Sequence, residues 1–140
     1  PRLENPGEQR ETRALYIQAC VAAAEAHLLK GEPDRARALV DSIALPTHGY
    51  YGGRALMLRA GALEMKDGPR AALAEYQRAA NLFGRFKELA AEAHYHVGEC
   101  HLRLGQAEAA RAAWQRVVDL YPQTEWAGRS KERLNASASR

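Results

Sequence analysis

The chain has 140 residues, enough for one domain with a continuous hydrophobic core. Alanine is its commonest residue and only 7% of residues are aromatic, which favours helices and argues against a β-sheet. The 20 basic and 17 acidic residues nearly balance and alternate along the chain, a pattern typical of a solvated helical surface and not of a nucleic-acid-binding face.

The N-terminal third predicts a helical pair behind a polar entry segment. Residues 1–11 are rich in Pro, Gly, Glu and Arg and predict a linker or frayed N-terminus. A helix is expected over about 12–30, with apolar residues at helical spacing, and Gly31 ends it. Pro33 suits the first turn of a second helix, which stops at Pro46.

The middle of the chain predicts a second pair. Residues 47–53 contain three glycines and form the least helical stretch, so we expect an extended turn there. A third helix is predicted over about 54–66. The fourth starts at Pro69 and ends at Gly84.

The last third predicts a third pair and one more helix. The fifth helix is expected over about 87–104 and the sixth over about 107–120. Thr124 is a good N-cap for a capping helix over 124–134. Residues 136–140 predict a disordered tail.

Similar sequence segments recur along this chain. The segment that begins at Tyr76 lies 38 residues before a similar one that begins at Trp114. A fainter copy over residues 22–43 places Gly31 74 residues before Gly105. A period in the high thirties made of two helical patterns indicates an α-solenoid, which is a fold that holds other molecules.

The third copy resembles the tetratricopeptide repeat. With its 34 positions numbered from Ala91, the residues at the family's characteristic positions are Val97, Gly98, Ala110, Trp114 and Pro122. His94 and His101 stand where the family usually has aromatics. The second copy slips by one residue in its first helix, which leaves open which face of the helix over 54–66 is buried. A one-residue-shorter turn near Asp67 would reconcile the two spacings.

The resemblance implies an all-α fold, a right-handed α-solenoid of three helix-turn-helix repeats with a C-terminal capping helix. The single domain would cover residues 12–135, with repeats at about 17–47, 54–86 and 91–124. The closing phrase at 116–134 is also similar to repeats of bacterial envelope proteins of the Tol–Pal coordinator and outer-membrane assembly lipoprotein types. That likeness implies a bacterial protein of the periplasm or the cytoplasm.

Four potential metal ligands lie within eight residues: His94, His96, Cys100 and His101. His96 and Cys100 are neighbours at i,i+4, but one helix cannot direct all four side chains at one centre, and no Cys-x-x-Cys or His-Glu-x-x-His spacing occurs. We therefore predict helix-packing histidines, no metal and no cofactor. Cys20 and Cys100, on different repeats about 20 Å apart, are expected to be buried and reduced.

The resemblance also implies a concave groove, lined by the first helix of each repeat, that binds a protein or peptide partner. The positions that line the groove in this family correspond to Gln18, Val21, Glu25 and Leu28 in the first repeat, Arg54, Met57 and Leu58 in the second, and Tyr95, Glu99, Leu102 and Arg103 in the third. The basic-plus-asparagine clamp of chaperone-tail binders is absent, because its positions hold Glu25, Ala62 and Glu99. These residues suit a helix or an extended peptide held by apolar anchors, with Tyr95 as a contact.

We therefore predict a non-catalytic scaffold or adaptor module, since no nucleophile pattern, phosphate loop or carboxylate pair occurs. No nucleic-acid partner and no direct membrane insertion are expected, because no apolar run approaches the ~18 residues of a membrane helix. Two alternatives stay open. One is a regulatory or sensor domain of a larger signalling or transcription-control protein. The other is a self-assembling homo-oligomer that uses repeat ends around Tyr16 and Trp126.

Overall fold

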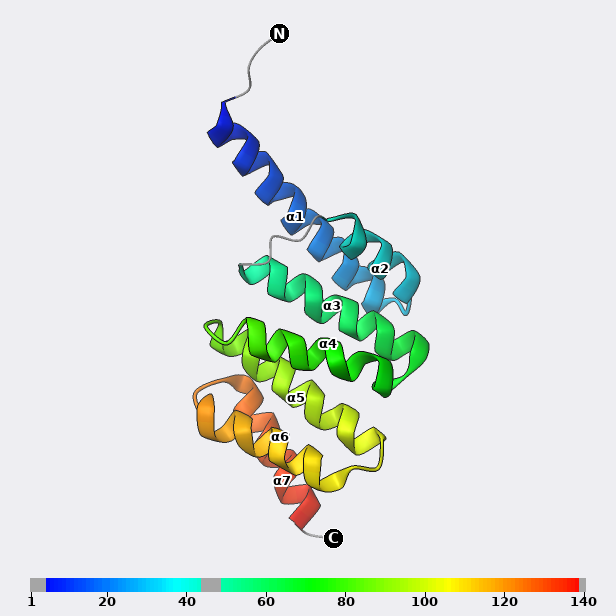
Figure 1. The fold of residues 1–140 in the computed structure, drawn as a ribbon, viewed down its shortest axis with the longest axis vertical. Coiled ribbons are helices and arrows are strands. Elements are labelled where there is room, and N and C mark those ends of the chain that lie inside the picture. The colour runs from blue at the N-terminus through cyan, green and yellow to red at the C-terminus, as the bar shows by residue number, and fades with distance from the viewer. Residues whose placement is uncertain (1–4, 44–48, 139–140) are drawn as a thin grey trace.

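The protein is a stack of helical pairs in the computed structural model, which describes residues 5–43 and 49–138 (Figure 1). All elements of this described part are α-helices, so the all-α prediction is confirmed. Their bounds are α1 Pro6–Leu29, α2 Pro33–Ser42, α3 Tyr50–Asp67, α4 Pro69–Leu82, α5 Lys87–Arg103, α6 Ala107–Leu120 and α7 Glu125–Ala138.

The helices form two layers. Helices α1, α3, α5 and α7 form the inner layer, in which each helix contacts the next one of the layer. Helices α2, α4 and α6 form the outer layer and, within the described residues, contact only their inner-layer neighbours. Because the inner helices pack side by side while the outer helices are held apart, the stack curves with the inner layer on its concave side, as in other solenoids.

Glycines set the turns inside each helical pair. Gly31, Gly68 and Gly105 lie 37 residues apart and all have positive φ, at 75°, 91° and 76°. Side chains disfavour this left-handed region, so glycine suits these positions. Gly68 alone separates α3 from α4, whereas three residues separate α1 from α2 and α5 from α6. The turn near Asp67 is therefore shorter than the other two, as predicted, but by two residues and not by one.

Helix α3 is buried on both sides, because α1 and α2 pack on one side of it and α4 and α5 on the other. This answers the question of which face is buried. The extended turn predicted over 47–53 is wrong from Tyr50 onward, since α3 begins there. Gly53 lies inside the helix, where an added Cβ would come within 2.9 Å of Phe83. That glycine permits close helix packing and not a turn.

The two chain ends are also more helical than predicted. Helix α1 begins at Pro6 and not near residue 12, and the Gly7 amide donates to the Asn5 side chain at 3.1 Å. An Asn N-cap followed by proline is a strong helix start. Helix α7 continues to Ala138, beyond the predicted end at 134. The remainder of the predicted linker, turn and tail, at 1–4, 47–48 and 139–140, lies outside the described residues.

The core follows the repeat order. One cluster joins α1, α2 and α3, a second joins α3, α4 and α5, and a third joins α5, α6 and α7. Trp114 is 2% exposed and its indole N–H donates to the carbonyl oxygen of Tyr95 at 3.3 Å. Val97, Gly98 and Ala110 are buried with it, in the positions that the resemblance implies. Each repeat therefore completes its core only against a neighbour.

Candidate partner-binding surface

All the predicted groove residues lie on the inner layer, but their environments differ. Met57 and Leu58 are buried in two different core clusters, because α3 packs between its neighbours on both sides. Val21 is buried as well. Met57 and Leu58 are therefore core side chains and not open partner contacts, contrary to prediction, whereas Val21, although buried, borders a hollow between α1 and α3. Gln18, Leu102 and Arg103 are exposed, and the others are partly buried.

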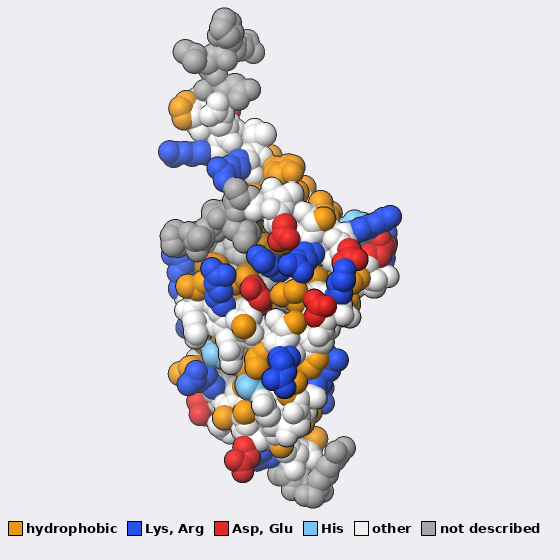
Figure 2. Space-filling model, turned by 45° about the vertical axis from the view of Figure 1, so that its right-hand side comes forward, with side chains coloured by type: hydrophobic (Ala, Val, Ile, Leu, Met, Phe, Trp, Pro, Cys, Tyr) orange, Lys and Arg blue, Asp and Glu red, His pale blue; other side chains and the backbone are white. Residues whose placement is uncertain are grey.

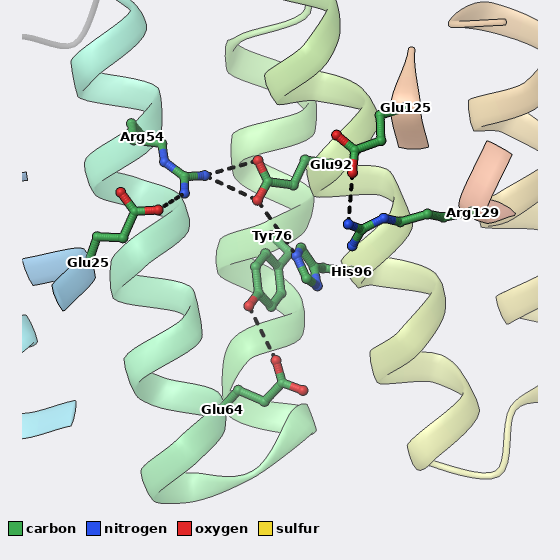
Figure 3. Close-up of polar contacts among 8 residues, drawn as sticks. All are labelled: Glu25, Arg54, Glu64, Tyr76, Glu92, His96, Glu125 and Arg129. Atoms are coloured by element: carbon green, nitrogen blue, oxygen red, sulfur yellow. Dashed lines mark hydrogen bonds and ion pairs between the residues drawn. The ribbon is translucent and has the colours of Figure 1, made fainter. Parts of the chain in front are cut away.

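Arg54 ties three inner helices together (Figure 3). Its guanidinium donates to both carboxylate oxygens of Glu92 on α5, at 2.9 and 3.1 Å. Its other terminal nitrogen donates to Glu25 on α1 at 2.9 Å. The side chains of Arg54 and Glu92 are 19% and 18% exposed. Both bonds to Glu92 come from one nitrogen, Nη1, and this largely buried contact links α3 to α5 through charge-assisted hydrogen bonds, which are stronger than neutral ones.

The protonation of Glu92 follows from this contact. Burial by itself would raise the pKa of Glu92, but hydrogen bonds with His96 and Arg54 and the charge of Arg54 outweigh it and hold that pKa below its usual value. The same carboxylates outweigh the effect of burial on Arg54 and raise its pKa. Both groups are therefore charged at neutral pH.

Two further ion pairs cross the inner layer. Arg103 on α5 donates to Glu64 on α3 at 2.6 Å, and Arg133 on α7 lies 2.8 Å from Glu99 on α5. Glu64 also accepts a hydrogen bond from the hydroxyl of Tyr76, at 3.2 Å. Such exposed pairs add little stability. They do mean that residues predicted to orient a partner are already paired within the chain.

Sequence reasoning missed these pairs, although a signal for them exists. Arg54 and Glu92 are 38 residues apart, and Glu64 and Arg103 are 39 apart. Each separation is close to one repeat. Opposite charges one repeat apart on successive inner helices lie side by side in a solenoid, so this spacing predicts the pairing.

Helix α7 covers the C-terminal end of the inner layer. The ring of Tyr95 lies 5.2 Å from that of Trp126, and Arg133 donates to the Tyr95 hydroxyl at 3.4 Å. The ring of His96 stacks on that of Tyr76 at 4.9 Å (Figure 3). It also lies 5.6 Å from the ring of Trp126. Tyr95 is therefore part of the cap contact. The expectation that Trp126 marks an exposed repeat end is corrected, because this side chain is partly buried.

The open part of the inner layer lies at the other end of the stack. A hollow of about 560 Å³, the α1–α3 hollow, separates α1 from the start of α3. Its lining includes Leu15, Gln18, Ala22, Tyr50 and Tyr51. Leu15 is 65% exposed and Tyr50 is 47% exposed. The sequence analysis missed both tyrosines because it started the helix at residue 54.

The potential metal ligands of α5 point to different neighbours. His94 stacks on Tyr121, His96 stacks on Tyr76, and Nδ1 of His101 lies 2.7 Å from the Gln106 side chain. Cys100 is buried in the core, where burial raises the pKa of its thiol to about 12. Over residues 5–43 and 49–138, no group of three or more His, Cys, Asp or Glu side chains is placed to hold a metal ion.

Both cysteines are free thiols and are buried in different core clusters. No helix in the described part of the chain is long and apolar enough to cross a membrane. On the face drawn in Figure 2, basic and acidic side chains are interspersed and do not gather into one patch of either sign.

Replacing Glu92 by glutamine is expected to lower the free energy of unfolding at pH 7 by about 1–3 kcal/mol, because it weakens charge-assisted hydrogen bonds away from water. The pKa of Glu92 is depressed in the folded state, so its contribution is present above the ordinary glutamate pKa of 4.5 and is lost as the pH falls below it. Urea unfolding at pH 7 and pH 3.5 should show the difference from wild type shrinking at the lower pH.

Glu132→Gln is the control, because Glu132 is exposed and has no ion pair in the described structure. It should change stability little at either pH. An equal destabilisation by Glu92→Gln at both pH values would contradict the expectation.

The comparisons with known proteins agree with this geometry. Residues 91–124 match the family model of the tetratricopeptide repeat. The fold is similar to that of PcrH, solved in complex with the chaperone binding region of PopB, with a TM-score of 0.68 and 18% identity over 86% of this chain and 92% of PcrH. It is also similar to that of MamA, with a TM-score of 0.61 and 18% identity over 86% of this chain and 77% of MamA. No curated protein gives a significant sequence match.

Proposed function

We propose that this chain, a member of the tetratricopeptide-repeat family, is a non-catalytic module that holds a peptide or helix of a partner protein against its inner layer. Residues 91–124 match the repeat itself, and the described part of the chain folds as a stack of helical pairs similar to those of PcrH and MamA. PcrH, which shares the fold, was crystallised in complex with the chaperone binding region of PopB. That complex supports a protein partner as the kind of ligand.

The observation that carries this proposal is the α1–α3 hollow. Leu15 and Tyr50 present large apolar surfaces that are about half or more exposed, next to an opening wide enough for a side chain. Exposed aromatic and aliphatic groups around a concave surface are the usual anchors of a peptide, because a ligand side chain inserted there is desolvated. Gln18 and Glu25 line the same hollow and offer polar contacts at its edge.

Apolar residues at equivalent positions extend this surface along the stack. Leu28, Met65 and Leu102 occupy the same place in α1, α3 and α5, 37 residues apart, and the last two are exposed. Packed helices lie 8–10 Å apart, so successive anchors on a partner would be spaced by about that distance. An extended peptide covers it in about three residues and a helix in about six. Because the groove charges are paired internally, apolar contacts supply most of the affinity.

The proposal can be tested with a photo-crosslinking amino acid placed at Gln18 in the α1–α3 hollow or at Ala38 on the outer helix α2. The partner segment that crosslinks at position 18 is identified by mass spectrometry and made as a fluorescent peptide. Ala22→Trp, which fills the hollow, should weaken its binding at least about tenfold, a loss of 1.4 kcal/mol.

Ala38→Trp is the matched control, because Ala38 is an exposed alanine on the opposite layer. It should leave the affinity within about twofold. Circular dichroism should show that both variants keep the helical fold. Crosslinking at position 38 but not at 18, or full affinity in Ala22→Trp, would exclude the inner layer as the binding surface.

A further inference from the structure

A second hollow lies on the opposite side of the molecule. This α4–α6 hollow separates the outer helices α4 and α6, and α5 forms its floor. Its volume is about 330 Å³. Its lining residues are Gln77, Ala80, Asn81, His94, Val97, Ala112, Ala113 and Arg116. Two facts explain the space. The outer helices do not contact each other within the described residues, and three of the lining residues are alanines.

His94 makes this hollow differ from the corresponding places in the other repeats. Its equivalent in the first repeat, 74 residues earlier, is Cys20, and its equivalent in the second repeat, 37 residues earlier, is Met57. Both equivalents are buried apolar side chains in the core. His94 is only partly buried and lines the hollow with a polar ring. The third repeat therefore has a polar side chain at a position where the first two repeats have buried apolar side chains.

The polar groups around the hollow are hydrogen-bond donors without a negative partner. Gln77 and Asn81 lie one turn apart on α4 and carry amide groups, and Arg116 on α6 carries a guanidinium. None of the described residues that line the hollow carries a carboxylate. Within the described residues, these three side chains have no hydrogen bond or ion pair. On the inner layer, by contrast, Arg54 and Arg103 are both neutralised by glutamates.

The charge of the hollow defines the class of anion that it suits. Burial lowers the pKa of His94, and the nearby charge of Arg116 lowers it further, so the imidazole is neutral at pH 7. Arg116 then supplies the single positive charge. One positive charge with neutral donors beside it matches a monoanion, and a planar guanidinium matches a carboxylate through two parallel hydrogen bonds.

We propose that the α4–α6 hollow is a carboxylate-binding site. The carboxylate comes from the C-terminus of a peptide or from an Asp or Glu side chain of a bound protein. Arg116 forms the ion pair, Asn81 and Gln77 donate from the facing helix, and the carbon atoms next to the carboxylate pack on Val97 and Ala80. This site lies on the outer layer, so it is separate from the proposed peptide groove and does not depend on it.

Small probes test the site directly. The ¹⁵N-labelled protein is titrated with three acetylated tripeptides and followed by NMR through the side-chain amide of Asn81 and the Nε–H of Arg116. The first tripeptide, acetyl-Ala-Ala-Ala, has a free C-terminus. The second, acetyl-Ala-Glu-Ala-amide, has only a side-chain carboxylate, and the third, acetyl-Ala-Ala-Ala-amide, has none. We expect saturable shifts with at least one of the first two peptides and none with the third.

Arg116→Gln should weaken this binding at least about tenfold, because a hydrogen bond to a charged group is lost. Arg111→Gln is the matched control on the same helix, since Arg111 bonds to Ser137 and lies outside the hollow. It should leave the affinity within about twofold. Both arginines are exposed, so neither variant should alter the helical fold, which circular dichroism checks.

The pattern of binding distinguishes the sources of the carboxylate. Binding of the first peptide alone assigns the site to a chain terminus, binding of the second alone assigns it to an acidic side chain, and binding of both supports a general carboxylate site. Equal shifts with the amide-capped peptide, tighter binding of inorganic phosphate than of either carboxylate peptide, or unchanged affinity in Arg116→Gln would each overturn the proposal.

Discussion

Replacing Trp114 by alanine is expected to lower the free energy of unfolding by about 3–5 kcal/mol, the range of large buried aromatic deletions. The side chain is 2% exposed, and its loss leaves a cavity between α5 and α6 and removes the indole hydrogen bond to the carbonyl oxygen of Tyr95. Urea unfolding followed by circular dichroism measures the change. Trp126→Ala, at the partly buried end of the stack, should cost less. Similar losses in the two variants would contradict the central position of Trp114.

Replacing Gly98 by alanine is expected to lower the free energy of unfolding by about 1–3 kcal/mol, although alanine is the better helix former. The added Cβ would lie only 2.7 Å from Cδ1 of Trp114, in the middle of a packed interface. In the background of Trp114→Ala the ring is gone and the same substitution should stabilise the helix, by up to about 1 kcal/mol. Urea unfolding of the four proteins of this double-mutant cycle measures the change of sign.

Gly128→Ala is the control for helix propensity, because Gly128 lies in α7 and an added Cβ would meet nothing within 4 Å. It should stabilise the protein by a similar amount in both backgrounds. If Gly98→Ala destabilised the Trp114→Ala variant as much as the wild type, the contact with the indole ring would not be the cause.

Glycines and prolines at the helix ends explain how much of the fold could be predicted. Helix α6 runs over residues 107–120, as expected, because Gly105 and Pro122 bound it on both sides. The predicted start of α3 at residue 54 was wrong because a pair of glycines is also typical of a turn. Only the three-dimensional structure shows that Gly53 lies against Phe83 and Leu89, since a single sequence does not distinguish a packing glycine from a turn glycine.

The candidate surfaces were less predictable because they depend on contacts between repeats. Inner-layer positions followed from the repeat pattern, but whether Met57 faces solvent depends on both neighbours of α3. The link from Glu25 through Arg54 to Glu92 joins three helices that are distant in sequence. His94 was expected only to pack between helices, whereas it also lines a hollow whose other walls come from α4 and α6.

The unequal number of neighbours along the stack makes local stability uneven. Helix α3 is held on both sides, whereas, within residues 5–43 and 49–138, α1 contacts only α2 and α3 and its first turns, up to Tyr16, are exposed. Local unfolding at the N-terminal end therefore begins in these first turns of α1, where few packed side chains must be displaced. The α1–α3 hollow lies next to these turns, so a ligand bound there restrains this end of α1, and occupancy and resistance to proteolysis rise together.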